Sequence, residues 1–503
     1  MSTATAKAPK PRSKPTTKAA SMAQLSTAPR RAGDKRAARL ARQIEDDVAA
    51  AGWPVGKVLG TEAELTQRYA VSRSVLREAI RLVEHHQVAQ MRRGPGGGLM
   101  VQAPDMKGAT AALVIYLEFV DTSVADLTDL RLILEPLAVG LATQRLSEEG
   151  IQALRQAVAD ESAGPGERPA AGIPDRFHPA VASACGNPVL QLFLDILNNL
   201  SAHYAARPAR MSRAEVAAID ASVRHEHREL VDAIISGNAV RAQNLAQAHM
   251  EATRSLLLAS ASNRRAWNAR GGRPPAAKAK LAEVVAEQIR GDIVQSGADV
   301  GDWIASETEL RERYSVSRQV LREAIRLLEH HGVAKMRRGP GGGLFVAEPD
   351  PWSSIESIAV YLGYQGIDVQ DLRVVRDAVE LACLDRVLAQ EPDGEVARRL
   401  HAALQIDAAA PMAEIRTAVH DVHRELADLS GNPVLSLFLR VLTSLWERHG
   451  MKPPVGTSLT PPEVLRDMEQ AHAGIVEAVL SGDDELARHR MMRHLEALTA
   501  WWH

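Results

Sequence analysis

Arginines with helical spacing are the first residues of this chain that could do chemistry. They stand four residues apart in two separate segments, as Arg73, Arg77 and Arg81 and again as Arg318, Arg322 and Arg326. This spacing places each set along one face of a helix. Arginine is also the side chain that most often contacts guanine edges in the major groove of DNA. Each segment therefore predicts a DNA-contacting helix, and a solvated charged face is the alternative interpretation.

A second set of chemically capable residues consists of histidines that recur in register. Each member of the first group has a partner 245 residues further on: His178, His227 and His249 correspond to His423, His472 and His494. The flanking sequence differs strongly between the two groups. The retained register favours a shared chemical role over three unrelated core positions, and a hydrogen-bonded cluster in a helical core is the alternative.

Both sets lie within one long internal repeat. Residues 71–101 and 316–346 differ at only five positions, Ser74/Gln319, Val83/Leu328, Gln87/Gly332, Gln90/Lys335 and Met100/Phe345. An offset of 245 residues is far longer than a solenoid repeat, so a whole set of domains has been duplicated.

The elements around each arginine set predict a winged helix-turn-helix. Ser72 is a suitable N-cap for the arginine helix, and Thr61 with Glu64 forms a capping box for a short helix before it. Apolar residues then recur at helical spacing and predict a buried face: Val75, Leu76, Ala79, Ile80 and Val83. After the helix, two short apolar strands flank a glycine-rich turn, which predicts a wing. No Gly-Lys-Ser/Thr follows the glycines, which excludes a phosphate-binding P-loop.

The predicted DNA contacts extend from the arginine helices into the wings. The wing residues are Arg92, Arg93 and Gly96 in the first copy and Arg337, Arg338 and Gly341 in the second. Residues 62–101 and 307–346 resemble the DNA-binding domain of the GntR family of bacterial transcription regulators, through the shared run Val-Ser-Arg-x-Val-Leu-Arg-Glu-Ala-Ile. The resemblance implies that the arginines contact bases or phosphates of double-stranded DNA.

The helical block after each DNA-binding domain resembles the FCD effector domain of the FadR-type subfamily, through the contexts of the aligned histidines. The resemblance implies an antiparallel helical bundle in which one Asp and three His can hold a divalent metal, namely Zn, Ni, Fe or Mn. The implied ligands are Asp175, His178, His227 and His249 in the first copy and His420, His423, His472 and His494 in the second, where His420 occupies the position of the acidic residue. It also implies a small carboxylate effector, for which Arg131 and Arg376 are candidate ligands. An Arg131–Glu135 helix ion pair is the alternative role.

Charge and composition support this division of the chain. The net charge is −2, but residues 30–101 carry 13 basic and 8 acidic side chains. A basic DNA-binding region beside acidic domains is an electrostatic footprint of DNA binding. Cys185 and Cys383 are the two cysteines, at non-equivalent repeat positions, which favours a reducing, cytoplasmic compartment without disulfides. No apolar run is long enough to predict a membrane span.

We therefore expect a mainly α fold, in which two winged helix-turn-helix domains with small β wings alternate with two antiparallel helical bundles. The expected segments are a disordered basic tail (1–32), reader 1 (33–103), bundle 1 (104–262), a linker (263–278), reader 2 (279–348) and bundle 2 (349–503).

The expected function is effector-responsive transcription regulation, as a repressor. The duplication predicts a single-chain pseudo-dimer on a pseudo-palindromic operator, and a homodimer with four readers is the alternative. Two other classes remain open from the sequence. One is an architectural DNA-binding protein with silent effector domains, and the other is a metal-dependent enzyme, for which nothing beyond the ligand set argues.

Overall fold

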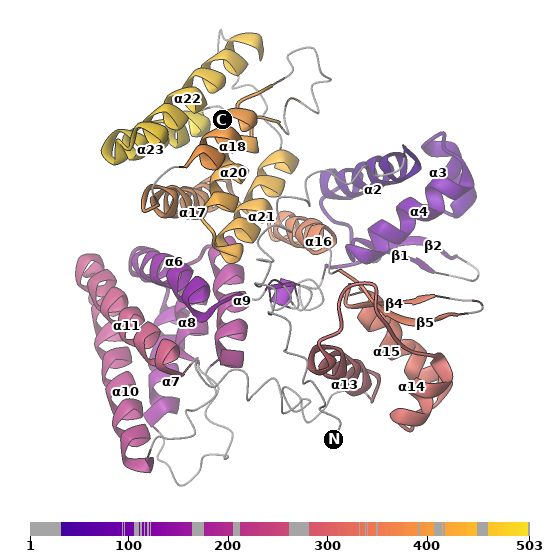
Figure 1. Cartoon of the computed structure of the whole chain (residues 1–503), viewed down its shortest axis with the longest axis horizontal. Helices are drawn as coiled ribbons and strands as arrows, with labels where there is room; N and C mark the ends of the chain where they lie inside the picture. Colours follow the sequence, from indigo (N-terminus) through magenta and orange to yellow (C-terminus); the bar gives the residue numbers. More distant parts are fainter. Residues whose placement is uncertain are drawn as a thin grey trace, which may run out of the picture.

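The computed structural model describes residues 32–104, 110–162, 176–204, 212–260, 281–348, 351–406, 415–449 and 461–500, apart from short gaps inside these ranges. The expected linker lies outside the described residues, as does the expected tail except for Ala32. The chain forms two readers and two helical bundles (Figure 1), which confirms the mainly α fold with small β wings. Among the described helices, none combines the length and apolar character needed to cross a bilayer.

Reader 1 forms the predicted helix-turn-helix and wing. Its elements are α2 (Ala32–Ala50), α3 (Glu62–Arg68), α4 (Arg73–His85), β1 (Ala89–Arg92) and β2 (Gly98–Val101). At the start of α3 the Glu64 N–H donates to the Thr61 hydroxyl at 3.3 Å, and the Thr61 N–H donates to the Glu64 carboxylate at 2.7 Å. At the start of α4 the Val75 N–H donates to the Ser72 hydroxyl. Both helix starts expected from the sequence are confirmed.

Reader 2 repeats this arrangement and adds a third strand. Its elements are α13 (Leu281–Ser296), β3 (Trp303–Ala305), α14 (Glu307–Arg313), α15 (Arg318–His330), β4 (Ala334–Arg337) and β5 (Gly343–Val346). The strands lie in the order β3-β5-β4, whereas the equivalent of β3 in reader 1 is a single bridge between Val58 and Met100.

The apolar face of each arginine helix holds its reader together. Leu76, Ala79 and Val83 of α4 are fully buried, and they pack with Leu40 and Ile44 of α2. Because this face of α4 is turned into the core, its arginines are left on the opposite, exposed face.

Bundle 1 and bundle 2 are antiparallel helical bundles of similar design. Bundle 1 contains α6 (Val124–Arg145), α7 (Glu148–Ser162), α8 (Phe177–Ala184), α9 (Pro188–Tyr204), α10 (Arg213–Ile235) and α11 (Ala239–Ser260). Bundle 2 contains α16 (Pro351–Tyr364), α17 (Val369–Leu388), α18 (Gly394–Ala403), α20 (Asp421–Leu429), α21 (Pro433–His449), α22 (Pro461–Ser481) and α23 (Asp484–Ala500).

The two bundles share one continuous apolar core. The rings of Phe193 in α9 and Phe438 in α21 meet across the junction with their centroids 4.0 Å apart. Asn187 caps α9 with its side-chain oxygen and donates its side-chain N–H to the Asp371 carbonyl at 2.9 Å. Asn432 makes the matching bond to the Asp126 carbonyl at 3.0 Å. These residues are related by the repeat offset, so the junction is reciprocal, as in an isologous dimer.

Reader 1 packs against bundle 2. Val360 of α16 belongs to the apolar core of reader 1, and the ring of Trp53 meets Tyr364 edge-on at a centroid distance of 5.2 Å. Arg42 of α2 also pairs with Glu356 of α16 at 3.1 Å. Reader 1 of the first copy is therefore attached to bundle 2 of the second copy (Figure 1).

Candidate functional site

The arginine helices carry exposed guanidinium groups on both readers. The side chains of Arg77 and Arg322 are 67% and 56% exposed. Their predicted neighbours on the same helices are also exposed: Arg73, Arg81, Arg318 and Arg326. The two sets have the positive charge and the access to solvent that insertion into a DNA groove requires.

A glutamate at the start of each preceding helix orients these arginines. Glu62 accepts from the Nε of Arg77 at 2.8 Å, while Glu307 accepts from the Nε of Arg318 at 2.8 Å. The Arg318 guanidinium, through its hydrogen bond, lowers the pKa of Glu307 below its usual range. Glu307 is therefore ionised at neutral pH. Its carboxylate stays paired with the Arg318 guanidinium until a ligand of Arg318 displaces it.

The wings place further cations beside the arginine helices. Arg92 is exposed on β1, and the guanidinium of Arg337 on β4 stacks over the Phe345 ring at 4.2 Å. Gly96 and Gly341 lie at the wing tips with φ of 70° and 72°. The predicted contacts Arg93 and Arg338 lie outside the described residues.

The three histidines of bundle 1 converge into one buried cluster. They come from α8, α10 and α11, and the Nε2 atom of His249 lies 3.3 Å from Nε2 of His227 and 3.4 Å from Nε2 of His178. Nitrogens bound tetrahedrally to one zinc ion at about 2.0–2.1 Å stand about 3.3–3.4 Å apart. The cluster therefore has the dimensions of a metal-ligand set, and the sequence prediction that these three histidines act together agrees with the geometry.

A carboxylate stands behind each histidine of bundle 1. The Nδ1 atoms of His178, His227 and His249 contact the carboxylates of Glu135, Glu161 and Glu226 at 3.1, 2.9 and 2.7 Å. An imidazole that donates its Nδ1–H to a carboxylate presents a bare Nε2 lone pair. Three such lone pairs facing one another form a set of nitrogen ligands that could hold a divalent metal. Asp175, the fourth predicted ligand, lies outside the described residues.

Bundle 2 gathers its three equivalent histidines even more tightly. The Nε2 atoms of His423, His472 and His494 lie 3.1 Å from one another in every pair. His420, the predicted fourth ligand, lies outside this cluster, with its ring centroid 6.4 Å from that of His423. The structure thus brings together three of the four residues predicted for this site.

Burial favours the neutral form of two of the clustered imidazoles. Burial, together with the neighbouring histidines, lowers the pKa of His249 to about 4 and that of His472 to about 3. Burial would raise the pKa of Glu135, but His178 and Arg131 reverse this and hold it well below its usual range. A neutral His249, a neutral His472 and an ionised Glu135 are the protonation states that a bound metal requires.

The two predicted effector arginines are both buried beside the histidine clusters, but they differ in their hydrogen bonds. Arg131 donates through both Nε and Nη2 to Glu135, as an ordinary helix ion pair would. Arg376 bonds to Glu380 through Nε only, and its buried Nη1 and Nη2 have no hydrogen-bond partner among the described residues. Its guanidinium stacks over the Trp446 ring at 4.3 Å. Two buried N–H-bearing nitrogens without partners are costly unless a ligand satisfies them.

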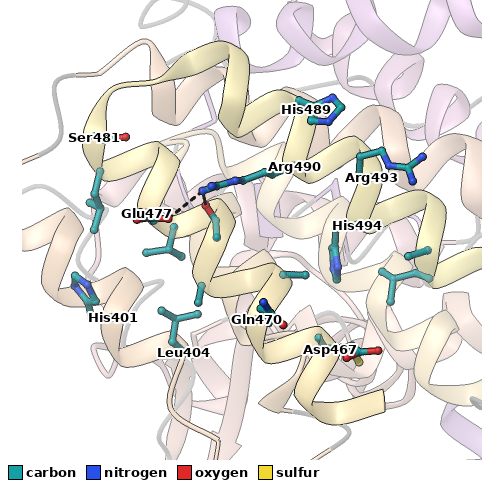
Figure 2. Close-up of a pocket in the computed structure, with 18 residues that line it drawn as sticks. His401, Leu404, Asp467, Gln470, Glu477, Ser481, His489, Arg490, Arg493 and His494 are labelled. Carbon is teal, nitrogen blue, oxygen red and sulfur yellow. Dashed lines mark hydrogen bonds and ion pairs between the residues drawn. The ribbon is translucent and has the colours of Figure 1, made fainter. Parts of the chain in front are cut away.

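The residue patterns did not predict that glutamates stand behind the histidines. Glu226 directly precedes His227, and Glu135 follows Arg131 by one helical turn, so both positions could have been noticed. Glu161 belongs to α7 and is far in sequence from His227, which it contacts, so no sequence pattern indicated this pair. A solvent-open groove of about 1240 Å³ beside His494 was also not predicted (Figure 2).

Comparison with known proteins agrees with this arrangement. Residues 36–98 and 281–346 match the family model of bacterial regulatory proteins of the gntR family, and residues 126–252 and 371–497 match that of the FCD domain. The HTH-type transcriptional repressor NanR of Escherichia coli K12 is 27% identical over 238 residues, which are 46% of this chain and 87% of NanR. NanR of Cronobacter sakazakii is 26% identical over 239 residues, covering 46% of this chain and 88% of that protein. Among solved structures, Streptococcus agalactiae GntR covers 44% of this chain and 99% of its own, with 22% identity and a TM-score of 0.32.

Proposed function

From the premise that this chain belongs to the GntR family of bacterial regulatory proteins and carries two FCD domains, we propose that it represses transcription as a single-chain pseudo-dimer and responds to a small carboxylate. DNA binding and small-molecule sensing follow from the two kinds of domain. Repression, the carboxylate and the pseudo-dimer are the parts that need experiments. NanR, which is similar to 46% of this chain, is a repressor by name.

The reciprocal junction between the bundles is the observation that carries the pseudo-dimer. Asn187 and Asn432 each cap a helix of their own bundle and donate across to the other bundle. The readers attached to this junction have nearly identical recognition helices, α4 and α15. Two like readers on a two-fold frame suit an operator with two similar half-sites.

The stoichiometry of the DNA complex tests this proposal. A bound sequence is selected from a random library, and the complex is weighed by light scattering. One chain on one pseudo-palindrome is the expected result, because the chain carries both half-site readers. Two chains per operator would refute the pseudo-dimer, and failure to enrich any sequence would favour an architectural DNA-binding protein.

Arg376 supports the carboxylate part of the proposal. Its two unpartnered nitrogens form one side of a guanidinium fork, the geometry that binds a carboxylate in bidentate fashion. His420 lies buried in the same bundle with its Nδ1 unpartnered, so a second polar group is available to a ligand. The histidine cluster beside them fits a divalent metal, which as a Lewis acid would attract the same anionic group.

An arginine-to-lysine pair of variants tests the role of Arg376. DNA affinity is measured by fluorescence anisotropy against a panel of acetate, malate and citrate. At least one of these acids should change the DNA affinity of the wild type. Arg376→Lys should need a concentration of that acid at least about tenfold higher for the same change, since a charge-assisted hydrogen bond contributes about 1.5–3 kcal/mol. Arg131→Lys, whose guanidinium is already paired, should respond as the wild type does. An equal loss in both variants, or no response to any acid, would contradict the assignment.

A further inference from the structure

The two histidine clusters are alike in their ligands and unlike in what stands behind them. The repeat offset places Ile406 where bundle 1 has Glu161, and Ala471 where it has Glu226. Only the third carboxylate is retained, as Glu380 in place of Glu135. The glutamates behind two of the three histidines therefore have no acidic residue at the equivalent positions of the second copy.

In bundle 1 the carboxylates fix every imidazole. Glu161 holds His227 through contacts of 2.9 and 3.0 Å, and Glu226 holds His249 at 2.7 Å. Each contact keeps the proton on Nδ1 and directs Nε2 toward the centre of the cluster. Outer partners of this kind raise the basicity of the ligand and set its orientation. The cluster of bundle 1 is thus preorganised for a cation.

In bundle 2 only His423 is fixed in this way, through Glu380. The described residues offer no hydrogen-bond partner to Nδ1 of His472 or His494. Helix α18 ends at Ala403, whereas its counterpart α7 continues to Ser162 and carries Glu161 near its end. Two imidazoles of bundle 2 therefore have no carboxylate behind them among the described residues.

A groove opens where the second carboxylate is missing. It lies between α18, α22 and α23, has a volume of about 1240 Å³, and is lined by Ala471 and His494 (Figure 2). In bundle 1 the equivalent of Ala471 is Glu226, whose carboxylate contacts Nδ1 of His249. The smaller side chain leaves His494 on the wall of this groove, although His494 is as deeply buried as His249.

We propose that the histidine clusters are functionally unequal, so that bundle 1 holds its metal as a resident ion while bundle 2 exchanges its metal readily. Each outer-shell partner contributes about 10–100-fold to metal affinity, so the loss of two predicts a gap of about 100-fold or more. The occupancy of bundle 2 then follows the supply of metal, while that of bundle 1 does not. This inference rests on the metal binding included in the proposed function.

Competition for Zn²⁺ tests the inference on the full chain. Metal-stripped protein is titrated with Zn²⁺ in the presence of a chromogenic chelator, and bound zinc is counted by mass spectrometry. One tight and one weak site per chain are expected. His249→Ala should remove the tight site, and His494→Ala the weak one.

Exchanging the outer residues supplies the matched controls. Glu226→Gln should weaken the tight site by about tenfold or more, and Ala471→Glu should strengthen the weak site by a similar factor. Both positions border solvent, so both variants should keep the wild-type circular dichroism and melting temperature. Two sites of equal affinity, or a weak site that is lost with His249, would overturn the inequality while leaving metal binding intact. No zinc at either site would overturn both the inequality and the metal binding on which it rests.

Discussion

Equivalent glutamates of the two readers have their shortest contact with different arginines. Glu62 pairs with Arg77, whereas Glu307 pairs with Arg318 at 2.8 Å and lies 3.4 Å from Arg322. Exposed ion pairs such as these contribute only about 0–1 kcal/mol, so DNA can replace the glutamate at little cost. The difference in pairing therefore leaves both sets of arginines available for DNA contacts.

Removing one of these arginines should weaken DNA binding in either reader. Arg77→Ala and Arg322→Ala are each expected to cost about 1–3 kcal/mol of binding free energy at the selected operator, the range for a lost base contact. Fluorescence anisotropy at fixed salt measures the loss. Arg493→Ala, which removes an exposed arginine from bundle 2, is the control and should bind as the wild type does. Arginine variants that match this control would show that the arginine face is merely solvated.

At the scale of the element, glycine decides the shape of the wing. Gly98 begins β2 with φ of 153°, and a Cβ at this position would lie 2.6 Å from the Gly60 carbonyl oxygen. Gly96 at the wing tip has φ of 70° and nothing within 4 Å of such a Cβ. The run of glycines thus serves two needs, close backbone approach at Gly98 and a left-handed turn at Gly96.

Alanine substitutions separate these two needs. In Gly98→Ala, backbone strain alone should lower the free energy of unfolding by about 1–3 kcal/mol. The total loss should be larger, because the Gly60 backbone must also move. Gly96→Ala should cost about 1–2 kcal/mol, the penalty for a left-handed residue alone. Urea denaturation followed by circular dichroism gives both values. A Gly96→Ala loss equal to or above that of Gly98→Ala would contradict the close approach seen at Gly98.

At the scale of the whole molecule, the bundles are joined by a core that neither could complete alone. Phe193 and Phe438 pack together with both rings fully buried, and Arg386 and Arg145 form ion pairs with Asp129 and Asp371 across the junction. Reader 1 in turn rests on α16 of bundle 2. Because α16 packs along α21, which carries Trp446 against Arg376, a change at Arg376 has a short packed route to reader 1. The effector response proposed for bundle 2 therefore has a physical connection to DNA binding.

Truncating one ring of the junction should uncouple the bundles. Phe193→Ala is expected to lower the free energy of unfolding by about 3–5 kcal/mol, the usual cost of deleting a buried aromatic ring. Because the cavity lies between the bundles, calorimetry should show two transitions where the wild type shows one for the joined pair. Leu154→Ala, in the core of bundle 1, is the matched control and should lower stability without splitting the transition. A single transition in Phe193→Ala would mean that the bundles do not depend on this contact.

Patterns in the amino-acid sequence were enough to predict the readers, the duplication and the members of each histidine set. Capping residues, helical periodicity and glycine-rich turns act over a few neighbouring residues, so Thr61, Ser72 and the apolar face of α4 could be recognised without a structure. The offset of 245 residues likewise aligned the histidines before any contact was known.

The three-dimensional packing was needed to identify the carboxylates behind those histidines and to show that His420 lies outside its cluster. It was also needed to show that Arg376 has unpartnered nitrogens and that reader 1 rests on bundle 2. These features depend on how helices far apart in the chain pack against one another. Glu161 and His227 are separated by 66 residues, and Val360 lies far from the reader whose core it enters. Packing of this kind is set by the summed shape of many side chains, which no local pattern of residue types records.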